Sequence, residues 1–153
     1  ILNESIKAQK VLESFEIKAD VWSATSFNML RKDGMEKERF NELNPTAKQK
    51  KTYVEECLPS SDTPVIAATD YMRAYPEQIR GFIKAPYYTL GTDGYGRSDS
   101  RQKLREFFEV DANNIARMAI YSLFRKGDIS KKEITSFYKK LKVDPSKPNP
   151  WEV

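Results

Sequence analysis

The sequence predicts an α/β domain with three layers, α/β/α, around a mostly parallel sheet. Val65–Thr69 is an uninterrupted apolar run, which is typical of a central parallel strand that is covered on both faces. Predicted strands alternate along the chain with segments whose apolar residues recur at helical spacing. The 153 residues favour one domain that is large enough for a single hydrophobic core.

The beginning of the chain predicts a helix followed by a strand. Apolar residues from Leu2 to Phe15 recur at the spacing of an amphipathic helix. Ala19–Thr25 is rich in β-branched and aromatic residues and predicts a buried strand, with Trp22 in the core. Because a helix precedes this strand, we expect that the first strand of the sheet is missing. The absence of an initiator methionine also suggests a fragment of a longer polypeptide.

Capping and breaking residues predict the elements that follow. Ser26 is a candidate N-cap for a short helix that Gly34 ends, and a second short helix ends at Asn44-Pro45. Residues 52–58 predict a short helix in which Cys57 is a packing residue. Pro59–Pro64 predicts a turn.

The middle of the chain predicts two strands with a helix between them. Asp70 follows Val65–Thr69 and is interpreted as the N-cap of a helix over residues 71–83, although the end of a buried strand is also where α/β proteins bind ligands. Pro76 should kink or split that helix. Tyr87–Gly91 predicts the third strand of the sheet.

The last third of the chain predicts three capped helices and a tail. The capping signals are Asp99 with Gln102, Asp111 before a helix that ends at Gly127, and Ser130 with Glu133. The end of the chain holds three prolines and predicts an extended segment. We therefore place the α/β domain at residues 1–143 and an extended tail at residues 144–153.

Composition excludes several classes of site. The chain has no histidine, which excludes Ser-His-Asp and Cys-His catalysis and imidazole zinc sites within it. The single cysteine excludes an internal disulfide and fits a reducing compartment. The net charge is only +4, and the basic residues of Ala47–Lys51 and Ser130–Lys142 are better explained as solvated lysines than as a nucleic-acid surface. No apolar run is long enough to cross a membrane.

The segment Gly91–Ser98, "GTDGYGRS", comes close to a phosphate-binding loop. It has the G-x-x-x-x-G spacing and the final serine, but Arg97 replaces the lysine that would reach the phosphates. The carboxylates of Asp93 and Asp99 would repel phosphate. We therefore favour a strand-to-helix turn in which Gly94 or Gly96 has a positive φ. In that reading Arg97 pairs with a carboxylate, either Asp93, Asp99 or one across an interface.

The candidate residues of this region share a place at turns that follow predicted strands. The candidates for turn and interface roles are Asp70, Asp93, Gly94, Tyr95, Gly96, Arg97, Ser98, Asp99 and Arg101. We assign none of them a catalytic, cofactor-binding or metal-binding role.

Three motifs carry a family resemblance. Leu90–Leu123 resembles the closing segment of transketolase-type C-terminal domains, with Gly94-Tyr95-Gly96-Arg97-Ser98 at the position of a Gly-Phe-Gly-x-Ser-like turn. Asp20–Gly34 and Ala68–Arg80 look like the homodimeric pyruvate dehydrogenase E1 family, and the terminal "NPWEV" is similar to its end. The motifs occur in the same order and cover nearly the whole chain. Members of that family begin this domain with a strand and a Gly-Ser-Gly turn, which the present chain lacks.

The resemblance implies a role inside a larger enzyme. The parent enzyme would decarboxylate pyruvate oxidatively with thiamine diphosphate and Mg²⁺, and would pass the acetyl unit to the lipoyl group of the dihydrolipoyl acetyltransferase (E2). The family's cofactor signature, Gly-Asp-Gly with a distant Asn, is absent, and Thr92-Asp93-Gly94 is not a substitute. The resemblance therefore implies an inactive, structural domain that contacts the rest of the E1 chain and the second protomer in a bacterial cytoplasm.

Two other hypotheses stay open from the residues alone. One is a nucleotide-binding module that uses Gly91–Ser98 as its phosphate loop. The other is a basic interaction domain that uses Lys48, Lys50, Lys51 and the helix within Lys131–Lys142. Neither nucleic acid nor a membrane is our expected partner.

Overall fold

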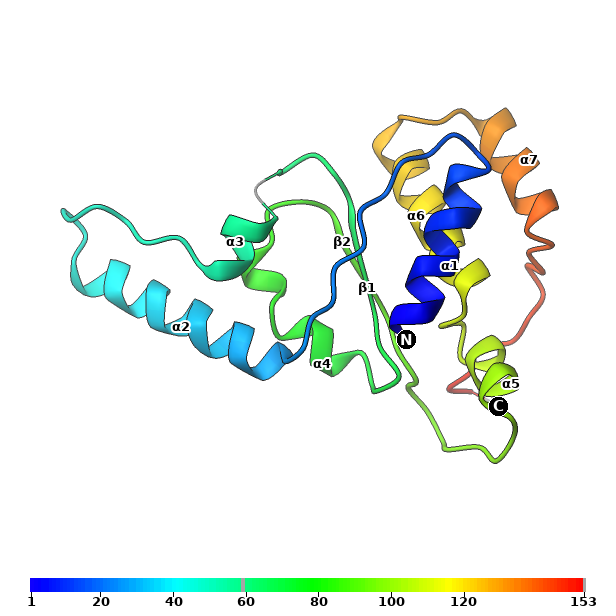
Figure 1. The fold of residues 1–153 in the computed structure, drawn as a ribbon, viewed down its shortest axis with the longest axis horizontal. Helices are drawn as coiled ribbons and strands as arrows, with labels where there is room; N and C mark the ends of the chain where they lie inside the picture. The colour runs from blue at the N-terminus through cyan, green and yellow to red at the C-terminus, as the bar shows by residue number, and fades with distance from the viewer. Residues whose placement is uncertain (59, 153) are drawn as a thin grey trace.

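The computed structural model describes residues 1–58 and 60–152 and confirms the α/β class (Figure 1). The elements in chain order are α1 (Leu2–Glu13), α2 (Phe27–Leu43), α3 (Tyr53–Cys57), β1 (Val65–Ala68), α4 (Ala74–Glu77), the 3₁₀ helix η1 (Arg80–Phe82), β2 (Tyr87–Leu90), α5 (Arg101–Phe107), α6 (Ala112–Lys126) and α7 (Lys131–Lys140). The two strands pair in parallel, with Val65 opposite Tyr87. No helix in the described ranges has the length and apolar character to cross a membrane.

Side chains of β1 alternate between the two faces of the sheet, as the pleat of a strand requires. Ile66 and Ala68 pack into a core formed with α1, α5 and α6, together with Leu90 of β2. Val65 and Ala67 pack against a second cluster that includes residues of α2, α3 and η1. The small sheet therefore lies between two helical layers, and the predicted three-layer arrangement is confirmed.

Several predicted helix ends are confirmed because they depend on local capping. Ser26 accepts a hydrogen bond from the backbone of α2, and Asp111 does the same for α6. Ser130 and Glu133 form the predicted capping box of α7. Gly127 ends α6 in the left-handed conformation, with φ of 95°.

The predicted strand Ala19–Thr25 is wrong, because these residues join no β-ladder in the described structure. The predicted place of Trp22 in the core is also wrong, since its side chain is 63% exposed. In Figure 1 this segment is the blue tube that leads from α1 toward α2. Strand preference alone cannot produce a strand, because the backbone groups need a partner strand at the correct distance.

Gly34 does not end a helix, and the two short helices predicted around it are one continuous helix, α2. Gly34 is buried, and a Cβ atom at this position would approach the Phe82 ring to 2.3 Å. Glycine at this position therefore allows α2 to pack closely onto η1. Glycine within a helix is less favourable than alanine by about 1 kcal/mol, but alanine would not leave room for the Phe82 ring. The predicted stop at Asn44-Pro45 is confirmed.

The predicted helix over residues 71–83 is split as Pro76 suggested. It consists of α4 and η1, and Pro76 lies in the first turn of α4, where its missing N–H costs little. The tail beyond α7 folds back, since the Lys147 ammonium donates hydrogen bonds to the carbonyls of Glu106 and Phe107 at the end of α5. Val153, at the end of the predicted tail, and Pro59, at the start of the predicted turn, lie outside the described residues.

Candidate functional site

The candidate residues gather at the carboxyl end of the sheet. Parallel strands place both of their carboxyl ends at one edge, so the turn after β1 and the turn after β2 become neighbours. A groove of about 680 Å³ at this edge is lined by five of the predicted residues, Asp70, Gly94, Gly96, Arg97 and Arg101, together with Ile1, Thr92, Leu104, Arg105, Phe108 and Val110. The other four predicted residues, Asp93, Tyr95, Ser98 and Asp99, do not line the groove.

Asp70 is the centre of an ion-pair network that joins three elements. The Arg105 guanidinium donates two hydrogen bonds to its carboxylate, Nε to Oδ1 at 3.0 Å and Nη2 to Oδ2 at 2.8 Å. The Ile1 amino group donates a further one at 3.0 Å. The bidentate arginine holds the pKa of Asp70 below its ordinary value, and the Ile1 ammonium adds to this effect. In a longer polypeptide the Ile1 nitrogen would be a peptide N–H, whereas the Arg105 contact would be unaffected.

Asp70 is not the N-cap that the sequence predicted. The hydroxyl of Thr69 accepts the hydrogen bond from the Tyr71 backbone N–H, and α4 begins only at Ala74. Asp70 instead points to Arg105 of α5, which also approaches Glu4 of α1 at 3.7 Å. The residue therefore fastens α5 to the end of β1.

Asp93 has its own arginine partner. Its Oδ1 accepts a hydrogen bond from the Arg73 backbone N–H at 3.1 Å, and its Oδ2 lies 3.2 Å from Arg73 Nε. Asp93 thereby connects the turn after β2 to the turn after β1. Its carboxylate stands inside the segment that a phosphate-binding loop would keep free of negative charge.

Gly94 is the glycine that adopts a positive φ, at 105°. A Cβ atom here would also approach the Trp151 Cα to 2.8 Å, so the turn and the tail are in close contact. The Arg73 guanidinium lies 5.1 Å from the centre of the Trp151 ring. The positive φ predicted for one of the two glycines is thus observed at Gly94.

Arg97 and Asp99 do not make the contacts that were predicted within the chain. The Arg97 guanidinium stacks over the Phe107 ring at 4.9 Å and, in the part of the chain that the structure describes, forms no salt bridge to Asp93 or Asp99. A carboxylate across an interface stays a prediction for Arg97. Ser100, rather than Asp99, caps α5 through a bond from the Lys103 N–H. Asp99 accepts a hydrogen bond from the Ser100 backbone N–H instead.

These contacts determine what the groove can do chemically. The Asp70 carboxylate of the groove is bound to Arg105, and the Asp93 carboxylate of the neighbouring turn is bound to Arg73. Among the residues that the structure describes, no three His, Cys, Asp or Glu side chains come close enough to hold a metal ion. The arrangement is therefore one that fixes two turns and a helix to each other.

Large apolar side chains surround this network at the surface. Tyr71, Met72, Tyr75, Tyr95 and Trp151 are all exposed, Tyr71 to 68% and Tyr95 to 83%. We refer to these five residues as the aromatic patch. The rings of Tyr71 and Tyr75 are 5.3 Å apart, and the Gly94 contact brings Trp151 to the turn that carries Tyr95. Exposed apolar surface of this kind is typical of a protein–protein interface.

Sequence reasoning missed the two arginines that organise the site. Arg73 and Arg105 lie 20 and 35 residues from the carboxylates that they bind. The spacing of Arg101 and Arg105 was a signal in the sequence, since side chains four residues apart share a helix face, whereas Arg97 lies before α5. This spacing indicates a basic face of α5 but does not identify the carboxylate that Arg105 binds.

Comparison with known proteins gives long matches to one kind of protein. The chain is 51% identical over 152 residues to the pyruvate dehydrogenase E1 component of Pseudomonas aeruginosa, which covers 98% of this chain and 17% of that protein. It is 44% identical to the E1 component of Cupriavidus necator and 40% identical to that of Escherichia coli K12, over 100% and 98% of this chain and 17% of each relative. The chain thus spans about a sixth of the length of these relatives.

The resemblance seen in the motifs is confirmed, because the chain matches the C-terminal part of pyruvate dehydrogenase E1 components, which are enzymes. The family described as "Transketolase-like TK C-terminal domain" matches residues 1–111, which include both strands and the whole ion-pair network of Asp70. On this evidence, the chain belongs to the transketolase-like C-terminal domain family.

Proposed function

We propose that this chain is a non-catalytic, structural domain of a thiamine-diphosphate-dependent pyruvate dehydrogenase E1 enzyme. In that enzyme it completes the fold and contributes to the interface between two protomers in the bacterial cytoplasm. The observation that carries the proposal is the aromatic patch next to a groove whose carboxylate, Asp70, is bound to Arg105. The site holds its elements rigid and presents apolar surface, which suits assembly better than chemistry.

The residues present do not fit the cofactor. A thiamine diphosphate site with Mg²⁺ needs oxygen ligands that are available to the cation, and Asp93 of Thr92-Asp93-Gly94 is bound to Arg73. We therefore assign thiamine diphosphate, Mg²⁺, the decarboxylation of pyruvate and acetyl transfer to the lipoyl group of E2 to other parts of the longer polypeptide. We derive no chemical step from this chain's own residues.

A chimera tests the proposal directly. This chain replaces the matched region of the Pseudomonas aeruginosa E1 component, to which it is 51% identical. We expect the chimera to form dimers and to decarboxylate pyruvate, whereas the same protein without the region loses both properties. A protein without the region that still folds and dimerises but has no activity would show that the domain supplies a chemical group, and the non-catalytic assignment would be wrong.

A matched pair of substitutions tests the interface. In the chimera, Tyr71→Ser removes part of the aromatic patch, and Tyr53→Ser removes an exposed tyrosine of α3, at 58% exposure. We expect Tyr71→Ser to weaken the dimer about tenfold or more in sedimentation equilibrium, as loss of a central aromatic contact does, and Tyr53→Ser to leave it unchanged. Equal dimer affinity for the two variants would remove the patch from the interface.

The nucleotide-binding alternative predicts micromolar binding of ATP with Mg²⁺ by the isolated chain. The ion pair of Asp93 and the stacking of Arg97 on Phe107 both disfavour it. Calorimetric titration with ATP and Mg²⁺, and separately with thiamine diphosphate and Mg²⁺, decides between the hypotheses. We expect no heat of binding in either titration.

A further inference from the structure

The net positive charge of the chain is concentrated in α7 and the two residues that follow it. Residues 130–142 hold five lysines and one glutamate, which accounts for the whole net charge of +4. Removing these six side chains from the 26 basic and 22 acidic ones of the chain leaves 21 of each kind. In Figure 1, α7 lies at the opposite end of the molecule from α2. The surplus of positive charge is therefore confined to one short surface.

The lysines of α7 lie on the face that points away from the core. Ile134, Phe137 and Tyr138 are half-buried and pack against the core that α1 and α6 form. The exposed residues of the opposite face are Lys131, Lys132, Thr135, Ser136, Lys139 and Lys140. We refer to these six residues as the lysine face. Two pairs of lysines thus stand eight residues apart, or roughly 12 Å along a helix, with two small hydroxyl side chains between them.

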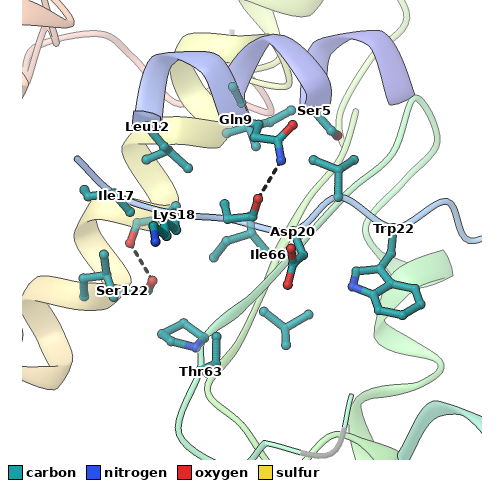
Figure 2. A pocket seen from close by; sticks show the side chains of 18 of the residues that line it. Ser5, Gln9, Leu12, Ile17, Lys18, Asp20, Trp22, Thr63, Ile66 and Ser122 are labelled. Atoms are coloured by element: carbon teal, nitrogen blue, oxygen red, sulfur yellow. Dashed lines mark hydrogen bonds between the residues drawn. The ribbon is translucent and has the colours of Figure 1, made fainter. Parts of the chain in front are cut away.

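The apolar face of α7 rests on the end of α1. Beyond Leu12 the chain turns back, with Glu16 at a positive φ of 61° and the Ile17 N–H donating to the Leu12 carbonyl at 3.0 Å. Leu12 and Ile17 line the cavity between α1, β1 and α6 (Figure 2). Phe15 instead contacts Phe137 of α7, with ring centres 4.7 Å apart. This packing fixes the backbone of the lysine face, which lowers the entropy lost when a partner binds.

Within the described residues, no lysine of this face forms a salt bridge. Glu133, the one acidic side chain in the sequence of α7, accepts a hydrogen bond from the Ser130 N–H at 2.7 Å in the capping box. The Lys140 ammonium lies 5.3 Å from the centre of the Phe15 ring. Lysines that do form salt bridges are Lys7, Lys37, Lys84, Lys103, Lys126 and Lys147. The charge of the lysine face is therefore not neutralised by carboxylates of the described chain.

The stability of the helix accounts for only half of these lysines. Lys139 and Lys140 lie in the last turn of α7, where the helix dipole favours positive charge. Lys131 and Lys132 lie in the first turn, directly after the Ser130 cap, where the dipole disfavours positive charge. Their presence there favours a role in binding an anionic group outside the helix.

We propose that the lysine face binds an acidic segment of another protein, with carboxylates in two groups about two helical turns apart. Positive charge that no neighbouring carboxylate neutralises attracts such a segment and fixes its register. A membrane surface fits less well, because the apolar face of α7 that would have to insert is packed in the core. Nucleic acid also fits less well, because Thr135 and Ser136 offer no ring on which a base could stack.

A helical probe peptide tests this interaction. The probe is a fluorescein-labelled, alanine-rich peptide with two pairs of glutamates eight residues apart, and its control has glutamine at the same positions. Binding to the 153-residue chain is measured by fluorescence anisotropy. We expect the glutamate peptide to bind at about 20 mM salt and to lose at least about fivefold in affinity at about 200 mM, because salt screens exposed charges. The glutamine peptide should not bind. Equal behaviour of the two peptides would overturn the proposal.

A matched pair of double variants locates the binding site. Lys132→Gln with Lys139→Gln removes one lysine from each pair, and Lys48→Gln with Lys51→Gln removes the same charge from exposed lysines of the loop before α3. We expect the first variant to bind the glutamate peptide about tenfold more weakly, as loss of two ion pairs predicts, and the second to bind it unchanged. Circular dichroism verifies that both variants are folded. Equal weakening in both would mean that the peptide responds to net charge alone, and the proposal would be wrong.

Two further probes distinguish the classes of partner. Vesicles of phosphatidylcholine with phosphatidylserine, and a DNA duplex, are each tested with the chain at about 150 mM salt. We expect binding to neither. Binding to one of them that Lys132→Gln with Lys139→Gln abolishes would assign the lysine face to a membrane or to nucleic acid and contradict the proposal. The inference does not rest on the proposed function, because α7 lies outside the residues 1–111 that match the family.

Discussion

On one face of the sheet, α1, α5 and α6 enclose a core in which Val110 and Ile120 have no exposed surface. On the other face, α2, α3 and η1 enclose a smaller cluster, where Ile79 and Phe82 remain 5% and 9% exposed. Among the residues that the structure describes, the larger core has eight buried residues and the smaller has four. In Figure 1, α2 and the loop after it extend away from the sheet, whereas α1 and α6 lie along it.

The difference suggests that the two layers have different stabilities. Free energy from apolar burial grows with the area removed from water, so the layer of α1 and α6 should unfold only with the whole domain. The layer of α2 has less buried surface and exposes Met29 and Leu43, at 62% and 64%. It should open locally at a lower free energy. The following predictions test this comparison.

The largest effect is expected in the larger core. Ile120→Ala removes a side chain with 0% exposure and should lower the free energy of unfolding by about 4 kcal/mol. For a domain of this size that corresponds to a fall in Tm of roughly 10 °C. Thermal unfolding followed by circular dichroism measures it, and hydrogen exchange should accelerate in both layers. Faster exchange restricted to α6 would contradict the assignment of this core to global stability.

A smaller effect, confined to one layer, is expected from Gly34→Ala. The added Cβ atom would lie 2.3 Å from the buried Phe82 ring, which should cost about 2 kcal/mol net of the higher helix propensity of alanine. Exchange should accelerate in α2 and α3 and remain nearly unchanged in α6. Gly81→Ala is the control, because a Cβ atom there meets nothing within 4 Å.

A double-mutant cycle identifies the cause of that effect. In a Phe82→Ala background the obstruction is gone, and Gly34→Ala should then be neutral or stabilising by up to about 1 kcal/mol. If Gly34→Ala destabilises equally in both backgrounds, contact with Phe82 is not the reason for the glycine.

These residues also show which features the sequence could predict. The caps Asp111 and Ser130 and the apolar strand Val65–Ala68 act through neighbours in the chain, and their predictions are confirmed. Gly34 was interpreted as a helix stop because its packing partner lies far along the chain. Local signals therefore identified the layers but not how the layers meet.

The site follows the same rule. Gly94 was one of two glycines predicted to take a positive φ, because turn chemistry is local. The pairing of Asp70 with Arg105 spans 35 residues, and no local pattern distinguishes it from helix capping. Within Ala19–Thr25, the strand preference is visible in the alternating burial of residues 19–22, although the segment joins no β-ladder among the described residues.

We expect Asp70→Asn to lower the free energy of unfolding by about 1 kcal/mol, because Asp70 connects α5 to β1 on the side of the larger core. The value is discounted for screening, because the Asp70 side chain is 46% exposed. Arg105 keeps the pKa of Asp70 below 3.8 in the folded chain, so the carboxylate contributes stability above that pH and loses it as the pH falls through the lowered pKa. The difference in unfolding free energy between the two proteins should therefore be constant from about pH 7 to 5 and shrink below about pH 4.

The control for Asp70 is Asp62→Asn, whose carboxylate pairs with Lys126 at 2.8 Å but is 79% exposed. Its effect should be within about 0.5 kcal/mol at every pH, as for most exposed ion pairs. Equal effects for the two aspartates would mean that Asp70 is an ordinary surface ion pair and does not fasten α5.

The smallest effect is expected from Arg97→Lys, which restores the lysine of a phosphate-binding loop to Gly91–Ser98. The variant should not bind ATP with Mg²⁺ in calorimetry, because Asp93 would still occupy the turn through its bond to Arg73, and α5 would still begin at Arg101, after the Ser100 cap. Stability should fall by less than about 1 kcal/mol, since lysine replaces the stacking of Arg97 on Phe107 only in part. Micromolar ATP binding by Arg97→Lys that the wild-type chain does not show would contradict this expectation. The turn would then be a phosphate-binding loop that one side chain prevents from binding ATP, rather than a connection between the ends of the two strands.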